Sequence, residues 1–226
     1  MKKFNFFNKK NQIKHFKSDN ISYSNNFIFI HVPKNAGTSV SKGFGIETSY
    51  HITVKEYINA LGKDTYENML SFAFVRNPFS RFLSLYNYAR MDESYYHSAI
   101  HPEKAIYGKH MDYDILKPAS IEEAAILLKE GKLVHNPPHT QWNPQCFWLK
   151  DQENNLNVKY LGRFEDMDFH LRNLTQLLGI KLKGNLSKTN VSSQTANNYK
   201  NIIGQETRAI LEEYYKEDLE AFNYDF

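Results

Sequence analysis

Short apolar segments alternate with amphipathic stretches along the chain. The segments 27–32 (FIFIHV) and 71–75 (SFAFV) predict buried strands, and 157–161 (NVKYL) predicts a weaker third strand. The first two are apolar on both faces, which is typical of strands in a parallel sheet that helices cover on both sides. The stretches that follow each strand have helical periodicity. The pattern therefore favours a doubly wound α/β fold, in which a central parallel sheet is flanked by helices in three layers.

Residues that commonly begin or end helices support this interpretation. We expect one helix to start at Thr38 and the last helix to extend over about 205–222. Two N-terminal caps and one terminating glycine are predicted at Asn77, Ser120 and Gly179. Each predicted strand is thus followed by a helix, as the alternating pattern requires.

Two segments do not fit the alternation. Segment 1–25 is predicted to be a solvated basic tail, because its beginning (MKKFNFFNKKNQIKHFK) contains six lysines and no acidic residue. Its phenylalanines leave weak association with a membrane surface as the alternative. Segment 91–147 is rich in His, Tyr and Pro, and long irregular insertions of this kind are usually functional or disordered. We therefore interpret 26–226 as one domain that carries an insertion at 91–147.

Composition narrows the classes of function. The formal net charge is +3 and the sequence pI is about 8.7, which fits an anionic ligand and does not single out nucleic acid. Cys146 is the one cysteine, so an intrachain disulfide is excluded and a reducing, cytoplasmic location is favoured. The sequence has no run of 18 apolar residues, so it predicts no transmembrane segment. The histidines of the insertion form no tight pair with a nearby acid, and no metal site is predicted.

Residues 33–39 (PKNAGTS) follow the first strand at its carboxyl end, where open parallel sheets bind ligands. Small residues there allow backbone N–H groups to converge, Lys34 adds a charge, and Thr38 and Ser39 add hydroxyl donors. This composition predicts a cradle for phosphate or sulfate, and the alternative is an ordinary strand-to-helix turn with a surface lysine. A P-loop-type kinase is disfavoured, because its Walker A motif has the lysine directly before the Ser or Thr.

A second strand-to-helix junction, FVRNPFSRFLSLYNYAR, carries three of the six arginines in the chain. Arginine is suited to fork-like contacts with phosphate. Arg76 ends the strand, and Ser84 lies about two helical turns beyond Asn77, near the same helix face. Both could therefore reach one phosphate. The alternatives are an internal salt bridge for Arg81, which we favour, and a small packing residue for Ser84.

These two motifs resemble those of sulfotransferases that use 3′-phosphoadenosine-5′-phosphosulfate (PAPS). HVPKNAGTSV is similar to their 5′-phosphosulfate loop, and VRNPFSRFLSLY is similar to their 3′-phosphate motif. The segments YLGRFEDMDFHLRNLTQLLGI and YYKEDLEAFNYDF also resemble the carbohydrate sulfotransferases, a group that includes heparan-sulfate 2-O- and chondroitin-type enzymes and bacterial relatives. The resemblance spans about 27–226 and implies a P-loop-like α/β domain.

The resemblance implies a role for each matching residue. Lys34 would contact the oxygen that bridges sulfate and phosphate, and residues 37–39 would hold the 5′-phosphate. Arg76 and Ser84 would hold the 3′-phosphate. The implied cofactor-binding residues are Pro33, Lys34, Asn35, Ala36, Gly37, Thr38, Ser39, Arg76, Ser84 and Lys188, of which the last belongs to a loosely matching loop at 186–199.

The acceptor hydroxyl must lose a proton, which calls for a base with a pKa near the working pH, usually His or Glu. His51 lies where related carbohydrate sulfotransferases have their base histidine, so the resemblance implies that His51 and Lys34 are the catalytic residues. Glu47 is the alternative base. His31 is expected to support the loop from the end of the strand.

The insertion 91–147 is expected to line the acceptor side. Its histidines, which we expect in the acceptor cleft or at the surface, are His97, His101, His110, His135 and His139. Tyr95, Tyr96 and Trp142 could stack on sugar rings, whereas Trp148 is expected in the core.

The sequence thus predicts an enzyme that moves a sulfuryl group from PAPS to a hydroxyl acceptor, with adenosine 3′,5′-bisphosphate as the product. The resemblance points to a carbohydrate as the acceptor, and the oligomeric state is left open. The alternatives are a non-catalytic nucleotide- or glycan-binding module of the same fold and, disfavoured by its motif, a P-loop-type kinase.

Overall fold

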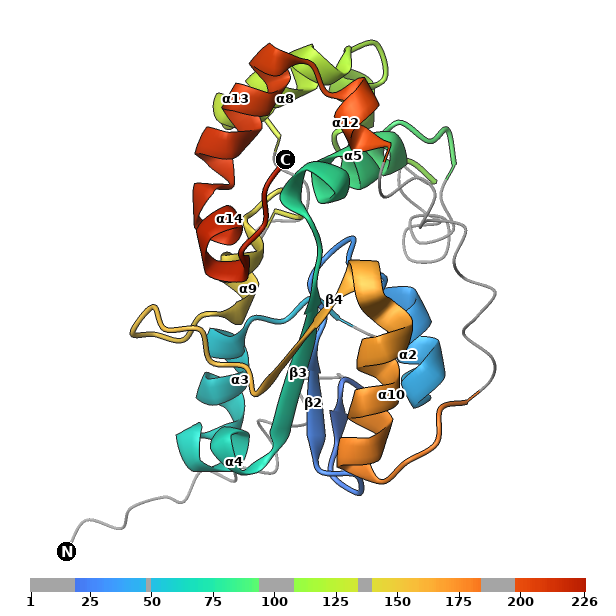
Figure 1. Cartoon of the computed structure of the whole chain (residues 1–226), viewed down its shortest axis with the longest axis vertical. Coiled ribbons are helices and arrows are strands. Elements are labelled where there is room, and N and C mark those ends of the chain that lie inside the picture. The colour runs from blue at the N-terminus through green and yellow to red at the C-terminus, as the bar shows by residue number, and fades with distance from the viewer. Residues whose placement is uncertain (1–18, 48–49, 94–107, 134–139, 184–197) are drawn as a thin grey trace, which may run out of the picture. The chain divides into compact units, whose positions relative to one another are not determined.

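A computed structural model of the chain describes residues 19–47, 50–93, 108–133, 140–183 and 198–226 (Figure 1). The chain divides into two compact units. The first unit comprises residues 1–75 and 146–189, and the second comprises residues 76–145 and 190–226. Both combine segments that are distant in the sequence.

The first unit contains a four-stranded, mostly parallel sheet. The strands β1 (Ile21–Ser22), β2 (Phe27–Ile30), β3 (Leu70–Val75) and β4 (Tyr160–Arg163) lie in that order. Strands β2, β3 and β4 are parallel, as predicted, and the chain is a mixed α/β protein. The edge strand β1, which the sequence pattern did not predict, is antiparallel to β2, so the sheet as a whole is mostly parallel. The physical reason is the short connection between them, because a connection this short joins only antiparallel strands.

Strand β1 lies within the segment that the sequence pattern assigns to the basic tail. Ile21 and Ser22 pair with Ile28 and Phe27, and the N–H of Phe29 donates to the carbonyl of Asn20. Residues 20–22 are therefore part of the sheet edge.

Helices lie on both sides of this sheet (Figure 1). On one side are α2 (Gly37–Phe44) and α10 (Met167–Leu178), the latter preceded by the short helix η1 (Phe164–Asp166). The other side has α3 (Val54–Leu61) and α4 (Lys63–Asn68). Buried apolar residues join the first pair of helices to the sheet, among them Phe27, Phe29, Val40, Phe72, Phe74, Leu171 and Leu174. This arrangement explains why the sequence of β2 and β3 is apolar on both faces.

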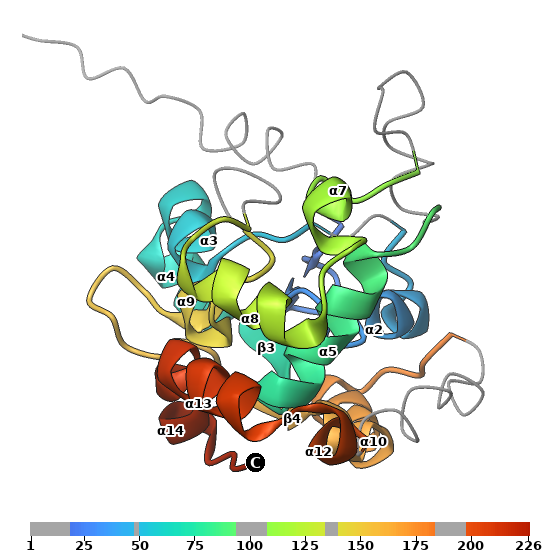
Figure 2. The same ribbon diagram turned by 90° about the horizontal axis from the view of Figure 1, so that it is seen from above.

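The second unit is helical. Its helices are α5 (Pro78–Ala89), α7 (Tyr113–Leu116), α8 (Ile121–Lys129), α12 (Tyr199–Ile202), α13 (Gln205–Tyr214) and α14 (Lys216–Phe222), and the short α9 (Gln145–Leu149) spans the division between the units. Helices α5, α8 and α13 pack side by side (Figure 2). Their shared core includes Phe82, Leu128, Trp142, Leu211 and Tyr215.

The predicted helix signals are confirmed. The side chain of Asn77 accepts hydrogen bonds from the N–H groups of Phe79 and Ser80, at 3.0 and 3.5 Å. Ser120 forms the predicted capping box with Glu123, and Gly179 ends α10 with φ of 63°.

Several boundaries differ from the prediction. Strand β2 ends at Ile30 instead of residue 32, β3 begins at Leu70 instead of residue 71, and α2 begins at Gly37 instead of Thr38. The third predicted strand begins at Tyr160 instead of residue 157. The predicted single helix over 205–222 is two helices, because the chain leaves the helical conformation at Tyr215. Tyr215 is 1% exposed, and its hydroxyl donates to the carbonyl of Trp142 at 2.9 Å. This tertiary contact accompanies the break, and local sequence periodicity does not report it.

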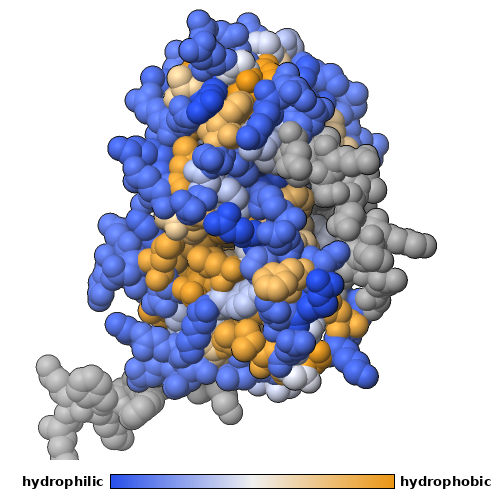
Figure 3. Space-filling view, in the orientation of Figure 1, coloured by the Kyte–Doolittle hydropathy of each residue, from blue (hydrophilic) through white to orange (hydrophobic). Residues whose placement is uncertain are grey.

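Apolar side chains are also present at the surface of the first unit. On α10, Phe169 and Leu177 are 55% and 64% exposed. Figure 3 shows orange areas among hydrophilic ones on the face that Figure 1 presents. Within the described residues, the helices include none that combines the length and apolar character needed to cross a bilayer.

Candidate active site

The loop that follows β2 has an unusual backbone conformation. Lys34 and Ala36 have φ of 67° and 61°, whereas Asn35 and Gly37 have negative φ. A left-handed conformation costs a residue with a side chain about 1–2 kcal/mol, and strain of this kind is retained mainly at functional sites. Alternation between right- and left-handed conformations turns successive N–H groups toward one point and forms an anion-binding nest. The two residues with positive φ are compatible with such a nest, and the anion cradle at 33–39 stays a prediction.

The helix that leaves this loop adds to the cradle. Helix α2 begins at Gly37, and its N-cap residue Ala36 provides no side-chain cap. Its amino-terminal end therefore presents N–H groups and a partial positive charge without a competing carboxylate or hydroxyl cap. Thr38 is exposed and Ser39 is half-buried, so their hydroxyls lie at the accessible start of the helix.

Two contacts hold the cradle in place. Asn35 is 2% exposed, and its amide donates to the carbonyl of Phe74 in β3 at 2.7 Å. The ring of His31 lies against Gly37 so closely that a Cβ atom at Gly37 would be 1.7 Å from Nε2 of His31. The His31 ring in turn stacks on Phe29, with ring centroids 5.4 Å apart. Glycine at position 37 is therefore required by the approach of His31 to the loop.

His51 lies next to the same imidazole. Its Nδ1 donates to the carbonyl oxygen of His31 at 2.8 Å, and the two rings have centroids 4.2 Å apart. Trp148, which is 1% exposed as expected for a core residue, lies on another side with ring centroids 5.9 Å apart. Because a carbonyl oxygen can only accept, the hydrogen is on Nδ1 of His51, and neutral His51 carries its lone pair on Nε2. This tautomer can take a proton at Nε2.

The charges around His31 show that Lys34 and His51 share one environment. Burial lowers the pKa of His31 well below its usual range, and the nearby charges of His51 and Lys34 lower it further. His31 is therefore neutral near pH 7 and adds no charge beside the cradle. Of the two predicted base candidates, His51 is in this environment, and Glu47 is exposed.

Asn20 belongs to this region and was not found from the sequence. Its side chain is fully buried and forms hydrogen bonds to the backbone of Tyr50, which directly precedes His51. Asn20 and Tyr50 are 30 positions apart, and no local motif connects them. The sequence gives no signal for Asn20, because the segment around it has the composition of a solvated tail. Only the structure shows that this amide is buried.

Arg76 and Ser84 lie in the second unit. Arg76 is 5% exposed, and its Nε donates to the hydroxyl of Ser80 at 2.9 Å. Gln145 holds the backbone of Arg76 at both polar groups, because it accepts from the N–H at 2.9 Å and donates to the carbonyl at 2.8 Å. Ser84 is half-buried on α5, one helical turn beyond Ser80. Ser80 and Gln145 are thus additional residues around Arg76 that the motif alone did not identify.

Arg81 is internal, with 1% exposure. Its guanidinium donates to the carbonyl oxygens of Asn143 and Gln141 at 3.0 and 2.7 Å. These bonds tie α5 to the segment before α9, which is a structural role.

The expectation for the insertion is wrong at His110 and Trp142. His110 is 2% exposed and Trp142 is fully buried, and both contact Asp112 in the core of the second unit. The large apolar area of Trp142 is used for packing, so it is not a platform for sugar rings. The other predicted insertion residues, His97, His101, His135, His139, Tyr95 and Tyr96, lie outside the described residues, as does Lys188. Within the described ranges, no group of three His, Cys, Asp or Glu residues could hold a metal ion.

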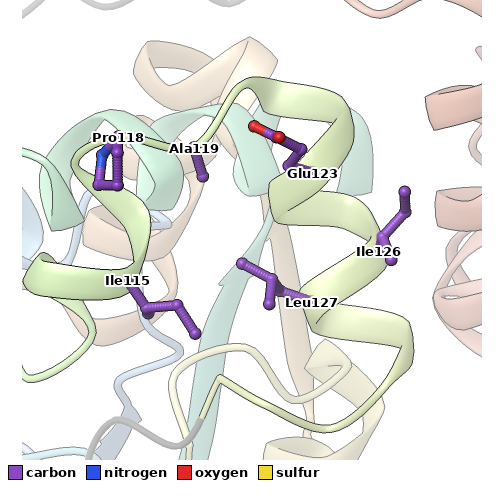
Figure 4. A pocket seen from close by; sticks show the side chains of 6 residues that line it. All are labelled: Ile115, Pro118, Ala119, Glu123, Ile126 and Leu127. Carbon is purple, nitrogen blue, oxygen red and sulfur yellow. The ribbon is translucent and has the colours of Figure 1, made fainter.

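A pocket of about 360 Å³ lies between α7 and α8 in the second unit (Figure 4). Its lining consists of Ile115, Pro118, Ala119, Glu123, Ile126 and Leu127. The carboxylate of Glu123 is engaged in the helix cap with Ser120, where the hydrogen bonds lower its pKa. Among the described residues, its lining includes no cationic group for a phosphate or sulfate, unlike the loop after β2, which contains Lys34.

The comparisons with known proteins concern the chain as a whole. Residues 19–225 match the model of a sulfotransferase family. Neither the curated proteins nor the solved structures contain a match to the chain. The matched range includes both units, and it extends from the segment of Asn20 to the end of the second unit. The chain therefore belongs to the sulfotransferase family.

Proposed function

We propose that this protein transfers a sulfuryl group from PAPS to a hydroxyl group of a carbohydrate acceptor. The observation that carries the proposal is the strained loop of Lys34 and Ala36 at the start of the uncapped helix α2, in the same environment as an imidazole held in its Nδ1–H form. An anion cradle and a base are the two parts that transfer to a hydroxyl requires.

The residues of the cradle fit the anionic part of PAPS. The N–H groups of 35–38 and the hydroxyls of Thr38 and Ser39 are the proposed ligands of the 5′-phosphosulfate, whereas the N–H of Ser39 donates to the carbonyl of Ala36 at 2.9 Å. Pro33 precedes the strained turn and restricts its backbone. Arg76 and Ser84 are the proposed ligands of the 3′-phosphate. The strand–loop–helix arrangement of β2 and α2 is the basis for proposing a P-loop-like fold, in which the nucleotide is bound mainly by backbone donors.

Lys34 has a different proposed role from the other cradle residues. PAPS supplies an activated sulfuryl group whose loss leaves negative charge on the bridging oxygen. A lysine that contacts this oxygen stabilises the transition state more than the ground state. Lys34 should therefore contribute more to turnover than to binding.

His51 is the proposed general base. Its Nδ1–H is held by the carbonyl of His31, so Nε2 can accept the proton of the acceptor hydroxyl. Neutral His31 neither competes for this proton nor adds charge near the cradle. The product is adenosine 3′,5′-bisphosphate. A cytoplasmic location remains part of the proposal, and weak association of the basic N-terminal segment with a membrane surface remains the alternative to a solvated tail.

A transfer assay tests this function. Labelled PAPS is incubated with the protein and a panel of glycans, lipids and small alcohols, and label in the acceptor is measured. His51→Ala should lower turnover by about 10²–10⁴ and leave binding of adenosine 3′,5′-bisphosphate unchanged. His170→Gln is the matched control, because His170 lies in the same unit and its ring pairs with the hydroxyl of Tyr160.

Binding without transfer would identify the non-catalytic alternative. If adenosine 3′,5′-bisphosphate raises the thermal midpoint more than AMP does, but no acceptor in the panel is labelled, the protein is a binding module. Equal thermal shifts from the two nucleotides would show that the 3′-phosphate is not recognised, and the assignment of PAPS would fail.

A further inference from the structure

The buried side chain of Asn20 connects two parts of the first unit. Its Nδ2 donates to the carbonyl oxygens of Phe29 and Tyr50, at 3.0 and 2.9 Å. Its Oδ1 accepts from the N–H of Tyr50 at 3.2 Å, and its own carbonyl accepts from the N–H of Phe29 at 2.8 Å. One amide therefore holds both backbone polar groups of Tyr50 against β2.

These bonds complete a closed series of contacts around His51. Tyr50 precedes His51, and Phe29 lies two positions before His31. The imidazole of His51 bonds to the carbonyl of His31, while the backbone just before His51 bonds to Asn20. The ring and the main chain of His51 are thus both held relative to β2, through separate hydrogen bonds.

Burial of Tyr50 does not provide the same anchor. Its side chain is 41% exposed, and the segment between it and α3 has no regular structure. A buried amide with satisfied hydrogen bonds is stabilising, whereas a lost partner leaves buried backbone groups unsatisfied. Two of the side-chain bonds of Asn20 are therefore directed at the irregular segment that leads into the base, and the third joins Asn20 to β2.

We infer that Asn20 is a positioning residue for His51, which acts by holding the backbone of Tyr50. The inference rests on the proposed function, because it assigns a role toward the proposed base. A base must lie within about 2.6–3.2 Å of the proton that it removes. A displacement of about 1 Å can lower a rate by about 10²-fold. Release of Tyr50 should therefore lower turnover and leave binding of the nucleotide unchanged.

The variant Asn20→Ala tests this inference. We expect a turnover number about tenfold to a hundredfold below that of the wild type, and an affinity for adenosine 3′,5′-bisphosphate within about twofold. The matched control is Asn59→Ala on α3, which also removes a side-chain hydrogen bond, to Gln152, but has no contact with Tyr50 among those described. The control should keep the turnover of the wild type.

A measurement that does not depend on catalysis accompanies the assay. Nitrogen NMR of the imidazoles, assigned with His51→Ala, reports the tautomer of His51 and the exchange of its Nδ1 hydrogen. In Asn20→Ala this hydrogen should exchange faster, or the population of the Nε2–H tautomer should rise. Wild-type turnover with an unchanged His51 signal would overturn the inference.

Folding failure and failure of the proposed function give different results. If Asn20→Ala does not fold, Asn20→Ser, which keeps one polar atom, is measured in the same way. If both variants unfold, Asn20 serves the whole fold and the positioning role is wrong. If the wild type transfers no sulfuryl group, the proposed function fails, while the NMR signal of His51 still decides whether Asn20 holds it.

Discussion

The contact between Gly37 and His31 gives a prediction with a calculable size. A Cβ atom at Gly37 would be 1.7 Å from Nε2 and 2.1 Å from Cδ2 of His31. Ordinary contact between such atoms is about 3.5–4.0 Å, so the ring or the loop must move by about 2 Å. The ring is confined by Phe29 and His51, with centroids 5.4 and 4.2 Å away. Gly37→Ala should therefore displace the loop.

The magnitude follows from two opposing effects. Forcing an extra methyl group into a packed site costs about 1–3 kcal/mol, and this site is at the upper end because the overlap is with a confined ring. Alanine is better than glycine inside a helix by about 1 kcal/mol, but less at the first helical position, which Gly37 occupies. We expect Gly37→Ala to lower the free energy of unfolding by about 2 kcal/mol.

A double-mutant cycle with His31→Ala tests the cause. Removal of the ring opens the space that the new methyl group needs. The cost of Gly37→Ala should therefore nearly vanish in the His31→Ala background, with a coupling of about 2 kcal/mol. Urea unfolding of the four proteins measures the free energy of unfolding. Calorimetry with adenosine 3′,5′-bisphosphate measures the nucleotide affinity, which should fall if the loop is displaced. If the two costs add, with a coupling below about 0.5 kcal/mol, the reasoning is refuted.

Three further predictions concern single groups. Arg76→Ala should weaken binding of adenosine 3′,5′-bisphosphate about tenfold to a hundredfold, as measured by calorimetry, and leave binding of AMP unchanged. Arg90→Ala is the control. Equal losses of affinity for both nucleotides would contradict a role in binding the 3′-phosphate. Lys34→Ala should lower the single-turnover rate more than the affinity for PAPS, and the reverse order would remove its role in the transition state. The pKa of His31 in the folded state lies well below 6.5, so on acidification the unfolded chain takes up this proton before the folded chain does. The contribution of His31 to the free energy of unfolding is therefore fully present above about pH 6.5 and is lost as the pH falls. Urea midpoints at pH 8.0 and 5.5 should therefore differ less in His31→Ala than in the wild type, and an identical pH dependence would show that His31 does not contribute.

The parts of the fold that depend on nearby residues could be predicted from the sequence. The caps at Asn77 and Ser120 and the stop at Gly179 are formed by side chains and turns within a few positions, and all three are confirmed. The apolar strands β2 and β3 were found because burial on both faces leaves a continuous apolar run. The small residues and the lysine of the loop after β2 predict an anion cradle, which stays a prediction.

The parts that depend on distant partners could not be predicted. The break in the last predicted helix coincides with a bond from Tyr215 to the carbonyl of Trp142, 73 positions away. Gln145 holds Arg76 from 69 positions away, and a glutamine in that segment has no distinctive pattern. His110 and Trp142 were assigned to the acceptor side because of their residue types, whereas burial beside Asp112 decides their role.

His31, which directly follows β2, makes two separate contacts. The side chain of His31 lies against Gly37 and limits the position of the cradle, while its carbonyl oxygen holds Nδ1 of His51. Substitution of the side chain leaves the carbonyl in place, because every residue has one. His31→Ala should therefore alter the anion cradle and nucleotide affinity more than the tautomer of His51. Asn20→Ala should do the opposite, because its bonds reach the backbone before His51 and none of those described reaches the loop. The two variants should therefore differ in which property changes: nucleotide affinity in His31→Ala, and the tautomer of His51 in Asn20→Ala. This difference is expected only if separate contacts to β2 hold the cradle and the base.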